Sequence, residues 1–158
     1  MEKSQLILSA TSLPSVSESV ALTLTDRADH HAAALNAAMT AMPDFAELIG
    51  PGNENLARSN HLNHFRYMAS LASVFDPVSL VEAVVWVLRT YRAQGFRLAY
   101  WDRMLPQAMQ ILREDLPPEH AAEVLPIYQW LIDHMHHFAE LSEKTPSFFE
   151  SLGTVPGE

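Results

Sequence analysis

Apolar residues recur at intervals of three and four along most of this chain, and that spacing constrains its fold more than any other feature. Between Asn53 and Phe75 the repeat consists of Leu56, Leu62, Phe65, Met68 and Leu71. In an α-helix such residues share one face, which has to be buried against other elements. No segment alternates apolar and polar residues, and the chain has only five glycines. The sequence therefore predicts an all-α domain.

Proline and glycine residues divide the chain into separate helices. Pro43 suits a first helical position, and Gly50–Pro51–Gly52 ends the short helix that it begins. Asn53 is placed to cap the next helix, and Asp76–Pro77 begins another. Gly95 is placed to end that helix in the left-handed conformation. Two further prolines lie within later helical patterns and predict a kink or a new helix start there, namely Pro106 and Pro126.

The length of 158 residues, with 48% hydrophobic content, suits one core of ordinary size. We expect about six to eight helices over residues 17–143, preceded by an N-terminal arm over residues 1–16 that is frayed or docked. Ser17 can cap the first helix, which the polar pair Thr25–Asp26 could divide. Residues 144–158 form a C-terminal tail, whose apolar residues could dock a partner or fold back onto the core: Phe148, Phe149 and Leu152.

Charge and cysteine content exclude several classes of function. The formal net charge of −9 repels nucleic acid phosphates and anionic membrane surfaces, so neither is expected as a primary partner. The absence of cysteine removes disulfides, iron–sulfur clusters and thiolate metal sites. No apolar run approaches the roughly 18 residues that span a bilayer, and the first 16 residues make a poor signal peptide. We therefore expect a cytoplasmic protein.

The eight histidines are the first candidates for chemistry. His61 and His64 are three residues apart and so share a helix face, as do His134 and His137. Two ligands do not make a metal site, and neither a HExxH motif nor a di-iron pattern accompanies them. Motifs for a serine nucleophile or a phosphate loop are also absent. We predict no metal and no enzymatic activity; a histidine-based metal hydrolase is the enzyme alternative.

Aromatic residues gather in the second half of the chain, on helices that are expected to pack together. Tyrosine and tryptophan combine a large apolar surface with a polar tip, so several of them around one cavity could line a ligand pocket. The same residues could equally form an ordinary core. The sequence leaves both interpretations open.

From Asn60 onward, the order of features resembles the globin domain of globin-coupled sensors. The matching residues are His64–Phe65, the Phe75–Asp76 corner, Tyr91 with the Gly95–Phe96 turn, Tyr100–Trp101 and the helix end between Leu112 and Leu116. In that family a histidine shortly before the turn binds haem iron, and here the position holds Tyr91. The chain is also similar to the non-haem globin domains of stressosome sensor proteins.

The resemblance implies a globin-like helical domain with a non-enzymatic sensory or regulatory function and without haem. It implies a pocket for a small apolar ligand, with contacts from Tyr91, His61, His64, Phe65, Trp101 and Met68. The alternative is a haem-binding globin that senses a diatomic gas or redox state through His61 or His64. Globin-type sensors pair through their last helices, so the expected homodimer or partner contacts are Trp130, His134 and His137.

Overall fold

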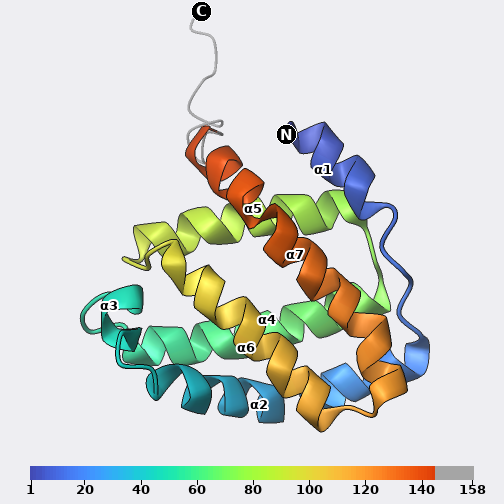
Figure 1. Cartoon of the computed structure of the whole chain (residues 1–158), viewed down its shortest axis with the longest axis horizontal. Coiled ribbons are helices and arrows are strands. Elements are labelled where there is room, and N and C mark those ends of the chain that lie inside the picture. The colour runs from blue at the N-terminus through green and yellow to red at the C-terminus, as the bar shows by residue number, and fades with distance from the viewer. Residues whose placement is uncertain (145–158) are drawn as a thin grey trace, which may run out of the picture.

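Seven helices make up residues 1–144, the part of the chain that this computed structural model describes (Figure 1). This confirms the prediction of an all-α domain with six to eight helices. None of the helices in this part has a stretch long and apolar enough to cross a lipid bilayer. The helices are α1 (Lys3–Ala10), α2 (Glu18–Thr40), α3 (Phe45–Ile49), α4 (Glu54–Ser73), α5 (Pro77–Ala93), α6 (Ala99–Asp115) and α7 (Pro118–Lys144).

Two groups of packed helices leave a gap between α4 and α5. The most extensive helix contact is between α2 and α4, and α6 packs on both α2 and α7. In turn, α5 packs on α7 and α1. Although α4 and α5 follow each other in the chain, they hardly touch, and Figure 1 shows α6 and α7 crossing in front of them. Helices α4 and α5 are therefore separated by side chains and do not pack directly on each other.

Two of the predicted helix starts are confirmed, whereas α3 begins at Phe45 and not at Pro43 as predicted. The Ser17 side chain accepts a hydrogen bond from the Val20 amide at 3.4 Å at the start of α2. The Asp76 carboxylate accepts one from the Ser79 amide at 2.8 Å, with Pro77 in the first helical position of α5. Asn53 precedes α4 as predicted, but the prediction that its side chain caps this helix is wrong.

The side chain of Asn53 joins two turns instead. Its Nδ2 donates to the carbonyl of Ile49 at 2.7 Å and to that of Gln94 at 2.8 Å, so it links the end of α3 to the end of α5. The amide of Arg97 adds a 2.8 Å bond to the carbonyl of Leu48. This polar contact fixes the position of the turn that follows Tyr91.

Gly95 ends α5 in the left-handed region, as predicted, with φ of 103°. The amide of Phe96 donates to the carbonyl of Tyr91 at 2.9 Å, and the amide of Gly95 donates to that of Arg92 at 3.0 Å. This pair of bonds is the Schellman motif, and the rings of Phe96 and Tyr91 make the apolar contact that accompanies it, with centroids 5.1 Å apart. The turn therefore fixes the backbone of Tyr91 at the end of α5.

Three predicted interruptions do not occur. Helix α2 runs without a break through Thr25–Asp26, and α6 and α7 continue through Pro106 and Pro126, so neither proline marks a new start. Pro106 lies on the exposed face of α6, where water can bond the carbonyl that a proline leaves unpaired.

The N-terminal residues hold a helix that docks on the domain. Leu6 of α1 is 0% exposed, and α1 packs on α5 and α7. The indole Nε1 of Trp130 donates to the Ser9 hydroxyl at 3.0 Å, and Lys3 forms an ion pair with Glu82. The candidate docking residues of the tail, Phe148, Phe149 and Leu152, lie outside the described residues.

Candidate functional site

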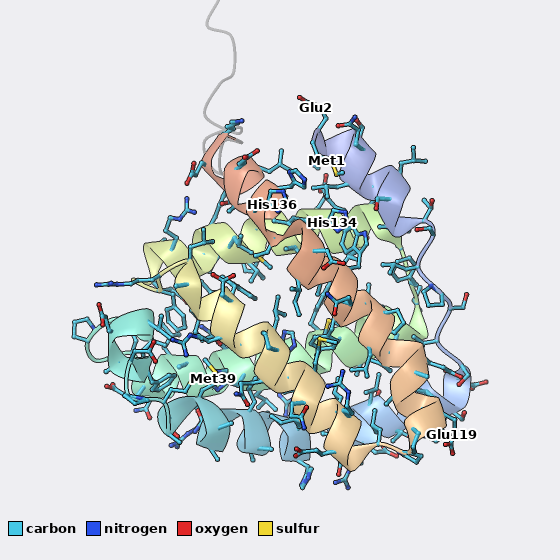
Figure 2. The ribbon with its side chains drawn as sticks, in the orientation of Figure 1. Met1, Glu2, Met39, Glu119, His134 and His136 are labelled. Atoms are coloured by element: carbon cyan, nitrogen blue, oxygen red, sulfur yellow. The ribbon has the colours of Figure 1, made fainter. Side chains whose placement is uncertain are left out.

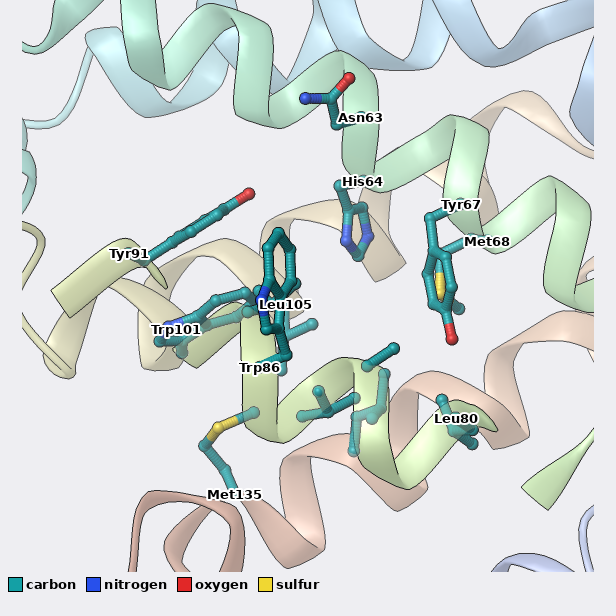
Figure 3. Close-up of a pocket in the computed structure, with 14 residues that line it drawn as sticks. Asn63, His64, Tyr67, Met68, Leu80, Trp86, Tyr91, Trp101, Leu105 and Met135 are labelled. Atoms are coloured by element: carbon teal, nitrogen blue, oxygen red, sulfur yellow. The ribbon is translucent and has the colours of Figure 1, made fainter. Parts of the chain in front are cut away.

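A pocket of about 330 Å³ lies between α4 and α5, with further walls from α6 and α7 (Figure 3). The lining residues of α5 recur at helical spacing, so one side of this helix faces the cavity over three turns. Its lining is mostly aliphatic and aromatic. The fourteen lining residues are Asn63, His64, Tyr67, Met68, Leu80, Ala83, Val84, Trp86, Val87, Tyr91, Trp101, Leu105, Leu131 and Met135.

Tyr91 stands at the α6 side of this pocket. Its ring stacks on Trp101 with centroids 5.0 Å apart, and burial raises the pKa of the phenol. The hydroxyl makes no hydrogen bond within residues 1–144, and its oxygen keeps some accessible surface. Figure 3 shows it pointing toward the wall that carries Asn63 and His64. The hydroxyl is therefore free to bond a molecule in the pocket.

His64 faces the cavity from the opposite helix. Its Nε2 lies 2.7 Å from the hydroxyl oxygen of Tyr128, which is fully buried. Burial, with a smaller contribution from His61, lowers the pKa of His64 to about 3, so the ring is neutral at pH 7. Its Nδ1 has no partner among the described residues. His64 thus offers the pocket one neutral hydrogen-bonding nitrogen.

His61 does not share this pocket, although the spacing predicted a common face with His64. It is 0% exposed, its Nδ1 donates to Asn36 Oδ1 at 3.1 Å, and its ring stacks on Tyr100 with an interplanar angle of 7°. Burial lowers its pKa to about 4, and its Nε2 is buried without a partner. Phe65 is also buried away from the cavity, against His31 and His64.

The structure therefore brings four of the six predicted contacts to the pocket: Tyr91, His64, Trp101 and Met68. Sequence reasoning missed the α5 wall and Trp86, which is 59% exposed at the rim. One signal was available, because α5 has more apolar residues than a single buried face requires. The excess side chains line the cavity.

The predicted interface residues lie together on α7 but differ in accessibility. Trp130 is buried beneath α1 and is not on a free surface. The Nδ1 of His134 donates to the Trp130 carbonyl at 2.8 Å, and the His137 ring lies 3.7 Å from that of His136. Figure 2 shows His134 and His136 on the part of α7 beside the first residues of α1. The described structure thus has α1 in contact with this part of α7.

A second polar cluster joins α2 to the end of α6. Arg27 donates two hydrogen bonds to Asp115, at 2.5 and 2.6 Å, and His31 Nε2 donates a third at 2.7 Å. The Arg27 guanidinium, with help from His31, lowers the pKa of Asp115 to about 2. A carboxylate at a helix C-terminus is unfavourable by itself, and these donors compensate for that. These hydrogen bonds therefore hold α2 against the end of α6, which is a structural role.

No group of three or more His, Asp or Glu side chains within residues 1–144 is arranged to hold a metal ion. The pocket lining carries no carboxylate, ammonium or guanidinium group. No family model matches this sequence, and neither a curated protein nor a solved structure gives a match.

Proposed function

We propose that this chain is a non-enzymatic, globin-like sensory domain without haem, which binds a small apolar ligand between α4 and α5. The observation that carries the proposal is the pocket itself, an apolar cavity of about 330 Å³ with a free hydroxyl and a neutral histidine on its walls. Ligand sites are typically such concave, mostly apolar cavities with a few polar groups that fix orientation.

The lining argues against an enzyme. General acid–base catalysis needs a group whose pKa lies near the working pH, and His64 has a pKa of about 3. Tyr91 is shifted in the opposite direction, since burial raises its pKa. Both groups therefore keep their protons fixed near neutrality, which suits hydrogen bonding to a ligand.

A sensor also has to transmit the presence of a bound ligand to a partner. Trp86 lines the pocket and is 59% exposed, so a bound ligand touches a residue that is part of the outer surface. The same helix, α5, packs on α1 and α7 and hardly on α4. We propose that ligand binding moves α5 relative to α4 and that a second copy or another protein reads this change, with His134 and His137 as candidate contacts.

Haem is the alternative ligand because the pocket lies between the helix of His64 and the helix that ends after Tyr91. The residues fit haem poorly. A tyrosine ligand to ferric iron has to be a phenolate, whereas burial raises the pKa of Tyr91 and no cationic side chain lines the pocket. His64 Nε2 already bonds Tyr128, and His61 lies outside the cavity. These contacts favour a ligand other than haem.

Naphthalene is a suitable probe for the pocket, with binding measured by calorimetry and stability by thermal unfolding. At ten times its dissociation constant, a ligand of the folded state alone stabilises by about 1.4 kcal/mol. Ala83→Phe fills the cavity and should abolish binding, whereas Ala122→Phe, at an exposed position of α7, should not. Failure of the wild type to bind, or equal binding by the Ala83→Phe variant, would overturn the proposal.

An absorbance spectrum with added hemin separates the two ligands. We expect no uptake and no sharp Soret band. A Soret band that weakens in Tyr91→Ala or in His64→Ala would instead establish a haem globin and identify the iron ligand.

A further inference from the structure

The chemistry of the pocket walls defines a class of ligand, an inference that rests on the proposed function. We propose that the pocket takes a neutral molecule of about two fused rings with a single hydroxyl or carbonyl group, which bonds Tyr91 and His64. Size, charge and the position of the free polar atoms each contribute to this assignment.

The volume sets the size of the ligand. A buried apolar cavity of about 150 Å³ is enough to bind benzene. At about 330 Å³ the pocket has roughly twice that space, which corresponds to two rings. Trp86 and Trp101 contribute flat aromatic surfaces on which rings can stack, and the thioethers of Met68 and Met135 adapt to their edges.

The lining determines the charge. None of its fourteen side chains carries a formal charge at neutral pH, since His64 is neutral there. An ionised ligand would lose its hydration in this pocket without gaining a counter-ion, which is strongly unfavourable. A neutral ligand avoids that penalty.

Two polar atoms on facing walls of the pocket define where the ligand's polar group lies. The Tyr91 hydroxyl on α5 and Nδ1 of His64 on α4 both lack a partner within residues 1–144. Figure 3 shows the Tyr91 hydroxyl directed toward the α4 wall. Asn63, Tyr67, Trp86 and Trp101 carry further polar groups without a partner in the described part of the chain, but Asn63, Tyr67 and Trp86 are exposed and can bond water. The rest of the lining is apolar and leaves room for the rings. One hydroxyl or carbonyl group at the Tyr91 side therefore has Tyr91 and His64 as its hydrogen-bond partners.

The test compares four probes of one ring system by calorimetry: naphthalene, 2-naphthol, 2-naphthoate and 2-naphthylmethylammonium. We expect 2-naphthol to bind about tenfold tighter than naphthalene, the effect of one additional hydrogen bond. Both ions should bind at least tenfold more weakly than 2-naphthol. Tyr91→Phe should remove most of the preference for 2-naphthol and leave naphthalene unchanged. Tyr100→Phe, a buried tyrosine outside the lining, should keep the preference.

The outcomes separate this inference from the proposed function. If no probe binds, the pocket is not a ligand site and both proposals fail. If naphthalene binds as tightly as 2-naphthol, or an ion binds tightest, the site remains and the ligand class is wrong. If Tyr91→Phe weakens naphthalene and 2-naphthol equally, the hydroxyl does not recognise the polar group. Circular dichroism of each variant confirms that it is folded.

Discussion

Acidification from pH 7 to pH 5 should destabilise this protein through the buried side chain of His61. The unfolded chain binds a proton at this side chain with a pKa of about 6.5. In the folded state, burial lowers that pKa to about 4. Between these values the unfolded state holds more protons, so each pH unit of acidification favours unfolding by about 1.4 kcal/mol. From pH 7 to pH 5 the loss amounts to about 2 kcal/mol for His61 alone.

The variant His61→Gln isolates this contribution. Glutamine retains an amide that can donate to Asn36 Oδ1, but it does not titrate. We expect the variant to lose about 2 kcal/mol less than the wild type between pH 7 and pH 5, whatever its stability at pH 7. Urea unfolding followed by circular dichroism at both pH values gives the free energies.

A control places the same new side chain on the surface. Ala122 is exposed on α7, and Ala122→Gln should follow the pH dependence of the wild type. Equal losses of stability for wild type and His61→Gln would refute the reasoning, because they would show that His61 takes up its proton in the folded state as readily as in the unfolded one.

Three further predictions concern the scaffold. Gly50→Ala should cost about 1–3 kcal/mol in urea unfolding, since φ is 85° and ψ is 154° there, and the new Cβ would lie 3.0 Å from the Gly95 carbonyl oxygen; Gly52→Ala, with no atom within 4 Å, should cost less. Asp115→Asn should lower the unfolding free energy at pH 7 by roughly 1–3 kcal/mol. Because the Asp115 carboxylate stabilises the fold above about pH 4 and loses this as the pH falls toward its folded pKa of about 2, the difference from wild type should shrink across that window; a constant difference would contradict the assignment. Leu6→Ala should speed amide exchange in α1 and leave α4 unchanged, and equal acceleration in both would show that α1 does not dock as a separate unit.

Features that depend on a few adjacent residues could be predicted from the sequence. Asp76–Pro77 and Gly95 each encode a helix boundary in their own chemistry, and the structure has both. The side chain of Asn53 could not be placed in this way, because its partners include Gln94, which is 41 residues away. The sequence also could not show that α6 continues through Pro106, because this depends on which face of the completed helix is exposed to water.

The candidate site was predictable only in part. Three residues along a helix change direction by about 60°, so His61 and His64 were expected to face the same way. In the fold, however, α4 has α2 on one side and the pocket on the other. His61 points to Asn36 of α2, and His64 to the cavity and Tyr128 of α7. Tertiary packing determines which neighbour covers each side of a helix, and this cannot be predicted from a local sequence pattern.

The gap between α4 and α5 has a consequence for how this chain can change over evolutionary time. The two helices on either side of the pocket are each held by packing on other helices: α4 packs on α2, and α5 packs on α7 and α1. Substitutions at Ala83, Val84 or Val87 can therefore reshape the cavity without removing the contacts that hold either wall in place. At these three positions, selection can therefore alter what the pocket accepts with little effect on the lining residues that also belong to the buried core, such as Leu80 and Leu105.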